Sequence, residues 1–459
     1  MVTLLDVVNR ALTGKPILER DYDLGLARKV KEVVKEYDIK YDPDTLVPSD
    51  DSLADDVFKA AFDLFCEVGA YCTDTGRVIK FDENEIKEGL KTAPSKLTFG
   101  EGADARTLIP RKPESTIPPF CFIGAGGAPV SSEEIFLSLV EGYASIPLTD
   151  SITTPALTSV NGIRIRPGTP LEILGAIRNV VLAREAMRRA GRPGIAIMNA
   201  LATASTSVAQ IAALHPKFGL RMTDGWLVAV IAELKTNFDL LNKVCALQSI
   251  GCRGGVNGEV SPILGGYAGG PEGTAVTTVA AHLMSRLVYQ AGWYISFPIH
   301  MNYGCNSTPE LLWAASVYAQ AISRNTHLLS LHLNYTAAGP CTEMVYYEIA
   351  AQRLAAVPSG VSIESVGVRG AAHEDYLTPM EPRFAAEVAH SVVGMKRDDA
   401  NEIVKTLVSK YADKIANPPK GLKYQECYDV KTGKPSEKVL ETYNKVKKEL
   451  EELGIEFKS

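Results

Sequence analysis

The chain of 459 residues lacks several features that would assign it to a large class of proteins. It has no run of the roughly 20 apolar residues that a membrane span needs, and its N-terminus does not have the layout of a signal peptide. It has no block of basic residues, and its formal net charge is only -6, so nucleic acid is not expected as a partner. Apolar residues make up 46% and charged residues 22%, which is typical of a folded globular chain, and we expect a cytoplasmic protein.

Motifs that indicate common chemistries are also missing. The eight cysteines are spread thinly, without a C-x-x-C pair, as in reduced intracellular proteins. There is no G-x-S-x-G elbow of a serine hydrolase, and neither glycine-rich segment, at 122–129 and 261–273, is a dinucleotide fingerprint or a P-loop. We expect these glycines to serve loop geometry and a close approach of the backbone to a ligand.

What the sequence does contain, from Phe120 onwards, is a repeat of short β-branched runs and helix-length amphipathic segments. Eight such runs begin at Phe120, Ser151, Gly194, Leu227, Asn257, Tyr294, His327 and Val361. The pattern predicts an α/β fold, a closed (β/α)8 TIM barrel over residues 116–383, with an open doubly wound sheet as the alternative. A helical N-terminal extension is expected over residues 1–115 and a helical C-terminal segment over residues 384–459.

Polar residues at the C-terminal ends of these predicted strands form the candidate site, because barrel enzymes place their chemistry there. Any one of them taken alone more often caps a helix or satisfies a buried loop. Together they predict a substrate-binding site at the mouth of the barrel. The candidates are Asn199, Glu233, Glu259, His300, Asn302, His332, Asn334 and Tyr335.

A zinc site is an open alternative, because His300, Cys305 and Cys341 flank two neighbouring strand ends. The spacing H-x4-C is not a recognised pair of zinc ligands. Ordinary buried cysteines and a hydrogen-bonded histidine are the simpler interpretation, so no metal ligand is predicted.

Four phrases carry a resemblance to a known family. They are YCTDTGRVIKFDENEI at 71–86, ILGGYAGG at 263–270, AGPCTEM at 338–344 and QECYDVKT at 425–432. They resemble the monomethylamine methyltransferases of methanogens. The resemblance implies a barrel that assembles as a homo-oligomer, a hexamer, and holds no cofactor tightly. It also implies that a bound methylamine gives its methyl group to the Co(I) of a separate corrinoid protein docked over the barrel mouth.

The resemblance also assigns site residues and shows two departures. The family has pyrrolysine after the phrase AGRPG, where this chain has Met198, or Leu201 if an insertion shifts the alignment. Leu333 stands where the family has a glutamine thought to hydrogen-bond the pyrrolysine adduct. Glu259 matches the active-site glutamate of the family, and Glu233 and Tyr335 also match family positions.

Losing pyrrolysine and its glutamine together predicts a changed methyl donor. Methylamine is a poor donor, and a pocket with Met198 and Leu333 offers only apolar surface beside the carboxylate of Glu259. We therefore expect a donor that is already cationic at its methyl-bearing atom, such as a quaternary ammonium or a sulfonium, aligned for displacement. The alternatives are a zinc-dependent methanol, methoxy or thiol methyltransferase, and a non-catalytic homologue that binds a methylated amine or a corrinoid protein and regulates.

Overall fold

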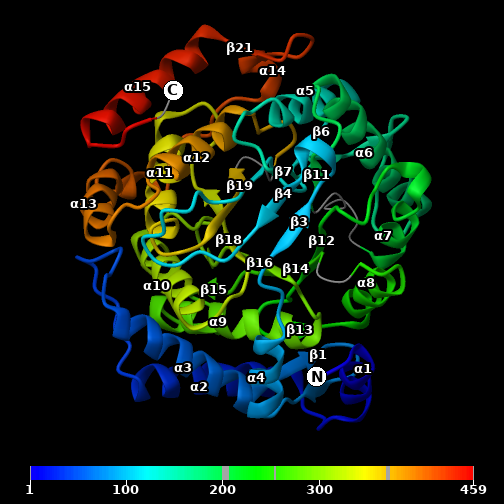
Figure 1. Cartoon of the computed structure of the whole chain (residues 1–459), viewed down its shortest axis with the longest axis vertical. Helices are drawn as coiled ribbons and strands as arrows, with labels where there is room; N and C mark the ends of the chain where they lie inside the picture. The colour runs from blue at the N-terminus through cyan, green and yellow to red at the C-terminus, as the bar shows by residue number, and fades with distance from the viewer. Residues whose placement is uncertain (1, 199–205, 253–254, 369–372, 458–459) are drawn as a thin grey trace.

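The centre of the molecule is a sheet of eight parallel strands (Figure 1). The computed structural model describes residues 2–198, 206–252, 255–368 and 373–457. Each strand lies in one of the eight runs that the sequence analysis identified, so the predicted barrel is confirmed. The strands are β5 (Cys121–Ile123), β7 (Ser151–Ile152), β11 (Ala196–Ile197), β12 (Trp226–Ala229), β14 (Val256–Val260), β16 (Trp293–Ser296), β18 (Ser330–Thr336) and β19 (Ser362–Val368).

The sheet closes on itself between β11 and β12. Its hydrogen-bonded order is β11-β7-β5-β19-β18-β16-β14-β12. The two end strands meet through a parallel bridge between Met198 and Gly225, and the Gly225 amide donates to the Ile197 carbonyl at 3.1 Å. A closed ring of parallel strands brings all eight C-terminal ends to one mouth.

A helix follows each strand along the chain. The helices are α5 (Glu133–Ala144), α6 (Pro170–Arg189), α7 (Ser207–Ala213), α8 (Phe238–Ser249), α9 (Pro271–Val288), α10 (Pro309–Asn325), α11 (Glu343–Ala356) and α12 (Met380–Ser391). Local sequence signals start them: Pro309 is in the first turn of α10, and the Thr308 hydroxyl caps that helix by accepting from the Leu311 amide. The expected boundary at residue 384 falls inside α12, which packs on β19 and β5 as the eighth barrel helix.

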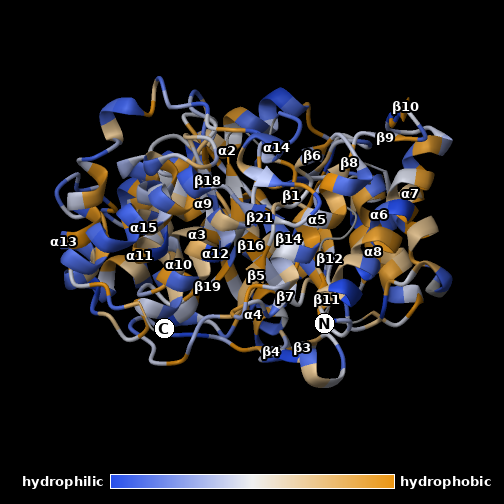
Figure 2. Ribbon diagram, turned by 90° about the horizontal axis from the view of Figure 1, so that it is seen from above, coloured by the Kyte–Doolittle hydropathy of each residue, from blue (hydrophilic) through white to orange (hydrophobic). Residues whose placement is uncertain are grey.

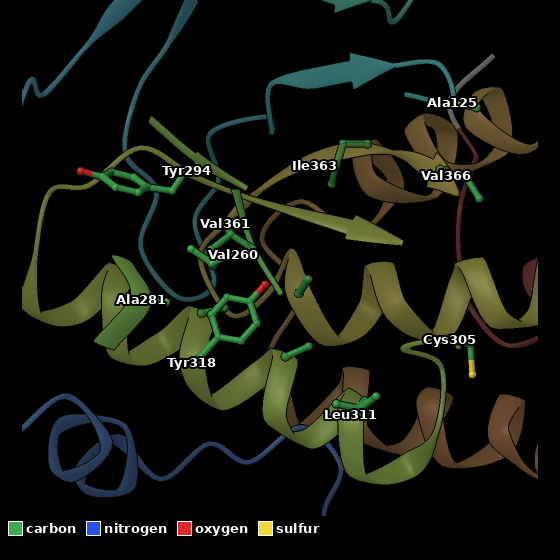
Figure 3. Close-up of a cluster of buried hydrophobic side chains, with 14 of the residues drawn as sticks. Ala125, Val260, Ala281, Tyr294, Cys305, Leu311, Tyr318, Val361, Ile363 and Val366 are labelled. Carbon is green, nitrogen blue, oxygen red and sulfur yellow. The ribbon is translucent and has the colours of Figure 1, made fainter. Parts of the chain in front are cut away.

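The strands bury one apolar layer on each side, because successive side chains of a strand point to opposite faces. The outer layer lies between sheet and helices, and Figure 3 shows part of it, with Val260, Ile363 and Val366 from the strands and Leu311 and Tyr318 from α10. The inner layer fills the barrel. It contains Phe120, Phe122, Ala196, Met198, Trp293, Ile295, Leu329, Leu331 and Leu333.

A hairpin covers the N-terminal end of the barrel. It is formed by β3 (Leu97–Phe99) and β4 (Arg106–Leu108), which lie across the barrel centre in Figure 1. The Phe99 ring meets the Trp293 ring inside the barrel, with centroids 5.6 Å apart. Figure 2 shows this hairpin at one end of the molecule and the hairpin of β9 (Ser159–Val160) and β10 (Ile163–Arg164) at the other. The barrel is therefore plugged at one end.

Short strand pairs lengthen the loops at the opposite end. Strand β6 (Pro129–Val130) pairs with β8 (Ala156–Leu157), and β15 (Ile263–Leu264) pairs with β17 (Ile299–His300). These pairs lie in loops that run from a strand to the following helix, and such loops surround the mouth of a barrel.

The terminal segments cover helices that are apolar on all sides. Helices α9, α10 and α11 are buried almost throughout, so one face packs on the barrel and the other needs a second cover. The N-terminal helices α1 (Leu4–Thr13), α2 (Glu19–Glu36), α3 (Asp51–Val68) and α4 (Glu83–Lys91) lie along one side of the barrel, where α3 packs on α9 and α10. On α11 pack α13 (Arg397–Val408) and α15 (Glu437–Glu452).

Small strands in the terminal segments were not predicted. In the N-terminal segment, β1 (Ala70–Cys72) pairs with β2 (Arg77–Ile79) and with β13 (Lys235–Thr236), which follows β12. In the C-terminal segment, α14 (Tyr424–Cys427) leads into the pair β20 (Tyr428–Asp429) and β21 (Lys434–Pro435). Within the described residues, the helices are all too short or too polar to cross a membrane.

Candidate functional site

A small cavity lies inside the mouth of the barrel, above the inner apolar layer. Its volume is about 110 Å³. It is lined by Leu227 of β12, Glu259 of β14, Leu333 and Tyr335 of β18, Glu364 and Gly367 of β19, and the loop residues 125–128. Three of the predicted site residues, Glu259, Leu333 and Tyr335, therefore meet in one place.

The cavity contains two carboxyl groups. Glu259 is half-buried because part of its side chain faces the cavity, and burial raises the pKa of its carboxyl to about 7. Glu364 is buried, and burial together with the charge of Glu259 raises its pKa well above the usual range. Among the described lining residues no side chain is basic, so nothing there neutralises the pair.

Sequence reasoning missed Glu364. Its strand, SIESVGV, was predicted, but whether Glu364 points inward depends on the register of β19 against β18. In that register Leu333 is opposite Glu364, so both side chains face the interior. The signal that could have found it is a single charged residue within an otherwise uncharged barrel strand, as Glu259 is in β14.

An irregularity in β19 makes room for Tyr335. Between Leu333 and Asn334 the register shifts by one residue, which places Gly367 opposite Tyr335. A β-carbon at Gly367 would lie 2.4 Å from Cε2 of the Tyr335 ring. Glycine is therefore required there, and Tyr335 can stack on Phe297 with centroids 6.2 Å apart.

Asn306, which the sequence analysis did not single out, holds the end of β18 in place. It lies just before α10, and its side chain donates to the Leu333 carbonyl at 2.8 Å and accepts from the Tyr335 amide at 2.6 Å. The Asn306 amide donates to the Tyr335 carbonyl at 2.8 Å. These bonds fix the strand that carries two of the cavity residues.

The first glycine-rich segment closes one side of the cavity, in line with the expectation of a close backbone approach. Residues 125–128 line it directly. Gly124 and Gly127 have φ of 130° and 72°, a conformation that favours glycine. Gly126 lies so close to Thr153 that an added β-carbon would be 3.1 Å from the hydroxyl oxygen.

The structure does not bring His332 and Asn334 into the cavity. They alternate with Leu333 and Tyr335 along β18, so they point outward to the helices. The Tyr318 hydroxyl of α10 bonds His332 Nδ1 at 2.6 Å, and burial lowers the pKa of His332 to about 3. Asn334 donates to the Ile349 carbonyl of α11 at 3.4 Å.

Glu233 also lies away from the cavity lining. After β12 the chain turns toward the N-terminal extension, where Lys235 forms ion pairs with Glu19 and Asp23 of α2. The Glu233 carboxylate accepts from the Ile263 amide at 2.9 Å, and burial raises its pKa to about 7. Its observed contacts are with the loop around β15 and not with the cavity.

The alternative zinc ligands do not converge in the described part of the chain. His300 ends β17 and packs against the ring of Tyr303, and its Nδ1 accepts from the amide of Asn302, an exposed residue. Cys305 is buried in the outer apolar layer. No group of three or more His, Cys, Asp or Glu side chains among these residues could hold a metal ion.

Met198 is fully buried in the inner apolar layer and does not line the cavity. Its side chain and that of Trp293 press on Gly225, where an added β-carbon would lie 2.9 Å from Met198 Cγ. Two further candidates, Asn199 and Leu201, lie outside the described residues.

The arrangement suits a small cation. The described lining offers acceptors and negative charge through two carboxyls and one aromatic hydroxyl, beside apolar walls, and it contains no nucleophilic thiol or serine. A buried carboxylate needs an opposite charge or a proton. A cationic ligand would supply the missing charge.

Known proteins resemble this chain over almost its whole length. The family model of monomethylamine methyltransferase MtmB matches residues 2–455. The chain is 34% identical to the MtmB1 of Methanosarcina barkeri and to the MtmB of Methanosarcina mazei, in each case over 455 residues and 98% of both chains. It superposes on the crystal structures of the Methanosarcina barkeri enzyme and of a hydroxylamine MtmB complex with a TM-score of 0.96, at 33% identity and over 99% of each chain. On this evidence the chain is a methyltransferase and belongs to the monomethylamine methyltransferase family.

Proposed function

We propose that this enzyme moves a methyl group from a small cationic methylated amine to the Co(I) of a separate corrinoid protein, and that it does so without pyrrolysine. The observation that carries the proposal is the pair of carboxyls in a small cavity whose described lining has no basic side chain. Family membership supports methyl transfer as the reaction. The donor is inferred from this chain's own residues.

The charge of the cavity favours a cationic donor. At neutral pH Glu259 is near the midpoint of its titration, so a positive ligand draws it into the ionised form. In the apolar surroundings of Leu227 and Leu333 the attraction is screened less than it would be in water. Glu259 is therefore the counter-charge that holds the donor.

The size of the cavity limits the donor. A water molecule occupies about 30 Å³ of liquid, so a cavity of about 110 Å³ holds roughly four groups of that size. This suits a methylated ammonium or sulfonium ion with few heavy atoms. Donors with long substituents would have to extend out of the mouth.

The residues contribute to the displacement mainly by alignment. A methyl group moves to a nucleophile when the attacking atom, the methyl carbon and the leaving atom lie in line. Glu259 fixes the charged end of the donor inside the barrel, which leaves a methyl group facing the mouth. The apolar walls exclude water, and the electron pair of the broken C–N bond stays on the nitrogen of the departing amine.

The mouth is also the side from which a partner can approach, since the β3–β4 hairpin covers the other end. Its loops expose apolar side chains, among them Ile163, Tyr267 and Met301. Exposed apolar groups around a concave site are typical of interaction surfaces. Docking of a corrinoid protein at this mouth is part of the proposal, while the homo-oligomer and the lack of a tightly held cofactor stay predictions.

Single-turnover methyl transfer tests the proposal. The purified protein is mixed with a Co(I) corrinoid protein and, in turn, with methylammonium, trimethylammonium, tetramethylammonium, trimethylsulfonium and methanol, and formation of methyl-Co(III) is followed by visible absorbance. We expect conversion with a small cationic amine and its loss in Glu259→Gln. Glu381→Gln is the matched control, because Glu381 is buried but bonds the Cys341 amide and Thr378 away from the cavity lining. Donor binding without conversion, with a competent corrinoid protein, would favour the regulatory alternative.

A further inference from the structure

Glu364 lines the cavity beside Glu259, but only Glu259 has an individual role in the proposed function. The Glu364 side chain is 4% exposed and lines the cavity opposite apolar groups. Within the described residues, its Oε2 atom has no hydrogen-bond partner. A buried polar atom without a partner costs stability, and in a ligand cavity it indicates a group that the ligand satisfies.

The charge of Arg353 on α11 does not offset the effects of burial and of Glu259 on this carboxyl. The Arg353 guanidinium of α11 donates to the backbone carbonyls of Glu364 and His332. It lowers the pKa of Glu364 less than burial and Glu259 raise it. The side chain of Glu364 is therefore left with a second carboxyl, Glu259, as its charged neighbour within the cavity.

The elements around β19 and the cavity supply the other charged and titratable groups near the pair. Strand β14 contributes Glu259, β18 contributes Tyr335 and, on its outer face, His332, β5 contributes Cys121, and α11 contributes Arg353. Helix α12 packs on the outer face of β19 and carries Glu381, Arg383, Glu387 and His390. Glu381 bonds the Cys341 amide and Thr378, and Glu387 bonds Arg383, Tyr443 and Lys447.

Two carboxyls that share a cavity ionise in sequence, and the less exposed one keeps its proton longer. Glu259 touches more of the cavity space and Glu364 is more deeply buried. Pairs of titratable groups whose environments separate their pKa values divide the roles of base and acid. When a bound cation draws Glu259 into its ionised form, Glu364 is thus the member of the pair that keeps its proton.

We propose that Glu364 is the proton donor to the leaving amine, while Glu259 remains the counter-charge of the bound cation. This inference rests on the proposed function and adds a second catalytic residue to it. As the methyl group moves to Co(I), the C–N bond breaks and its electron pair stays on nitrogen. As that pair develops on nitrogen, the Glu364 carboxyl gives its proton to it in the same step, so that the proton transfer lowers the barrier to C–N cleavage.

The step is balanced in atoms and charge. A cationic amine, Co(I) and a neutral Glu364 become methyl-Co(III), a protonated amine and a Glu364 carboxylate. No oxidant or reductant beyond the Co(I) acceptor is needed. The product leaves as an ammonium ion, which is a poor methyl acceptor, so the reverse transfer is suppressed. Water at the mouth returns the proton to Glu364 after the product has left.

The first test does not depend on methyl transfer. Infrared spectra of wild type and of Glu364→Gln are recorded at pH 8 without ligand, and one is subtracted from the other. We expect a protonated carboxyl band in wild type that the variant lacks, because Glu364 keeps its proton at this pH. If the spectra show that Glu364 is already a carboxylate at pH 8, the proposal is overturned, whether or not the enzyme transfers methyl groups.

The second test measures the transfer step. Glutamine has the shape and neutrality of a protonated glutamate but cannot give up a proton, so Glu364→Gln should bind methylammonium like wild type. Its single-turnover transfer should be slower by roughly 10²–10⁴-fold, the usual contribution of general acid catalysis. Wild-type transfer should fall at high pH as Glu364 ionises, and the variant should lack this decline.

Two variants separate a catalytic role from a structural one. Glu364→Asp keeps a carboxyl and should restore part of the rate together with the decline at high pH. Glu381→Gln should keep the wild-type profile. A Glu364→Gln enzyme with the rate and pH profile of wild type would remove Glu364 from the mechanism. If the wild-type enzyme transfers no methyl group from any donor, the proposed function is contradicted, and the infrared spectra alone decide whether Glu364 keeps its proton.

Discussion

The buried carboxyl of Glu259 should make the empty enzyme less stable as the pH rises. In the unfolded chain Glu259 ionises near its ordinary pKa of 4.5, whereas in the folded chain burial raises the pKa to about 7. The folded state therefore binds its proton more tightly. The resulting stabilisation is fully present below pH 4.5 and is lost as the pH rises through 7.

The magnitude follows from the size of the shift. One unit of pKa corresponds to about 1.4 kcal/mol, so a change from 4.5 to about 7 corresponds to on the order of 3 kcal/mol. For a chain of this length, each kcal/mol moves the thermal midpoint by about 1–2 °C. Replacing Glu259 with glutamine removes this contribution to the pH dependence of stability. The thermal midpoint of the variant, relative to that of wild type, should therefore rise by roughly 3–6 °C from pH 5 to pH 8.

Thermal unfolding of wild type, Glu259→Gln and the control Glu441→Gln, an exposed position on α15, measures this difference. Because other buried carboxyls titrate in all three proteins, only the difference between proteins is informative. Adding methylammonium at pH 8 should raise the wild-type midpoint by supplying the missing charge, and should do so less in Glu259→Gln. A gap between wild type and Glu259→Gln that stays constant from pH 5 to pH 8 would refute the reasoning.

Three further predictions concern residues in and around the cavity. Gly367→Ala should displace the Tyr335 ring, which lies 2.4 Å from the added carbon, cost about 1–3 kcal/mol of stability and weaken methylammonium binding measured by calorimetry. Asn306→Ala should release the end of β18, since it leaves buried backbone groups unpaired at about 1–3 kcal/mol each, and should raise the KM for the donor. Met198→Ala should cost about 2–5 kcal/mol in denaturant unfolding but keep the donor preference, because the side chain is fully buried and does not line the cavity. A changed donor preference in Met198→Ala with unchanged stability would contradict this placement.

The barrel could be predicted from the sequence because its pattern is repeated. Each β-branched run is followed by a helical segment with its own start signal, as at Thr308 and Pro309, so errors in a single element do not change the architecture. The hairpins β1–β2 and β3–β4 were missed since strands of three residues are too short to show a period of two.

The site could be predicted only in part, because the side chain of a strand residue can point to either face. Glu259 and Tyr335 were found at strand ends, but His332 and Asn334 were included with them although alternation points both outward. Which residues of β19 face inward depends on its register and on the shift beside Asn334. That register is a property of the closed sheet, and it decides that Glu364 belongs to the site.

The hairpin that shuts the N-terminal end of the barrel has a kinetic consequence. With Phe99 packed against Trp293 inside the barrel, the described residues close that end, and the donor, the departing amine and the partner all use the mouth. Under the proposed function the donor has to enter before the partner docks, and the amine can leave only after the partner has dissociated. Steady-state rates should therefore follow a compulsory order, and a large excess of partner protein should inhibit turnover by trapping the enzyme before it is loaded.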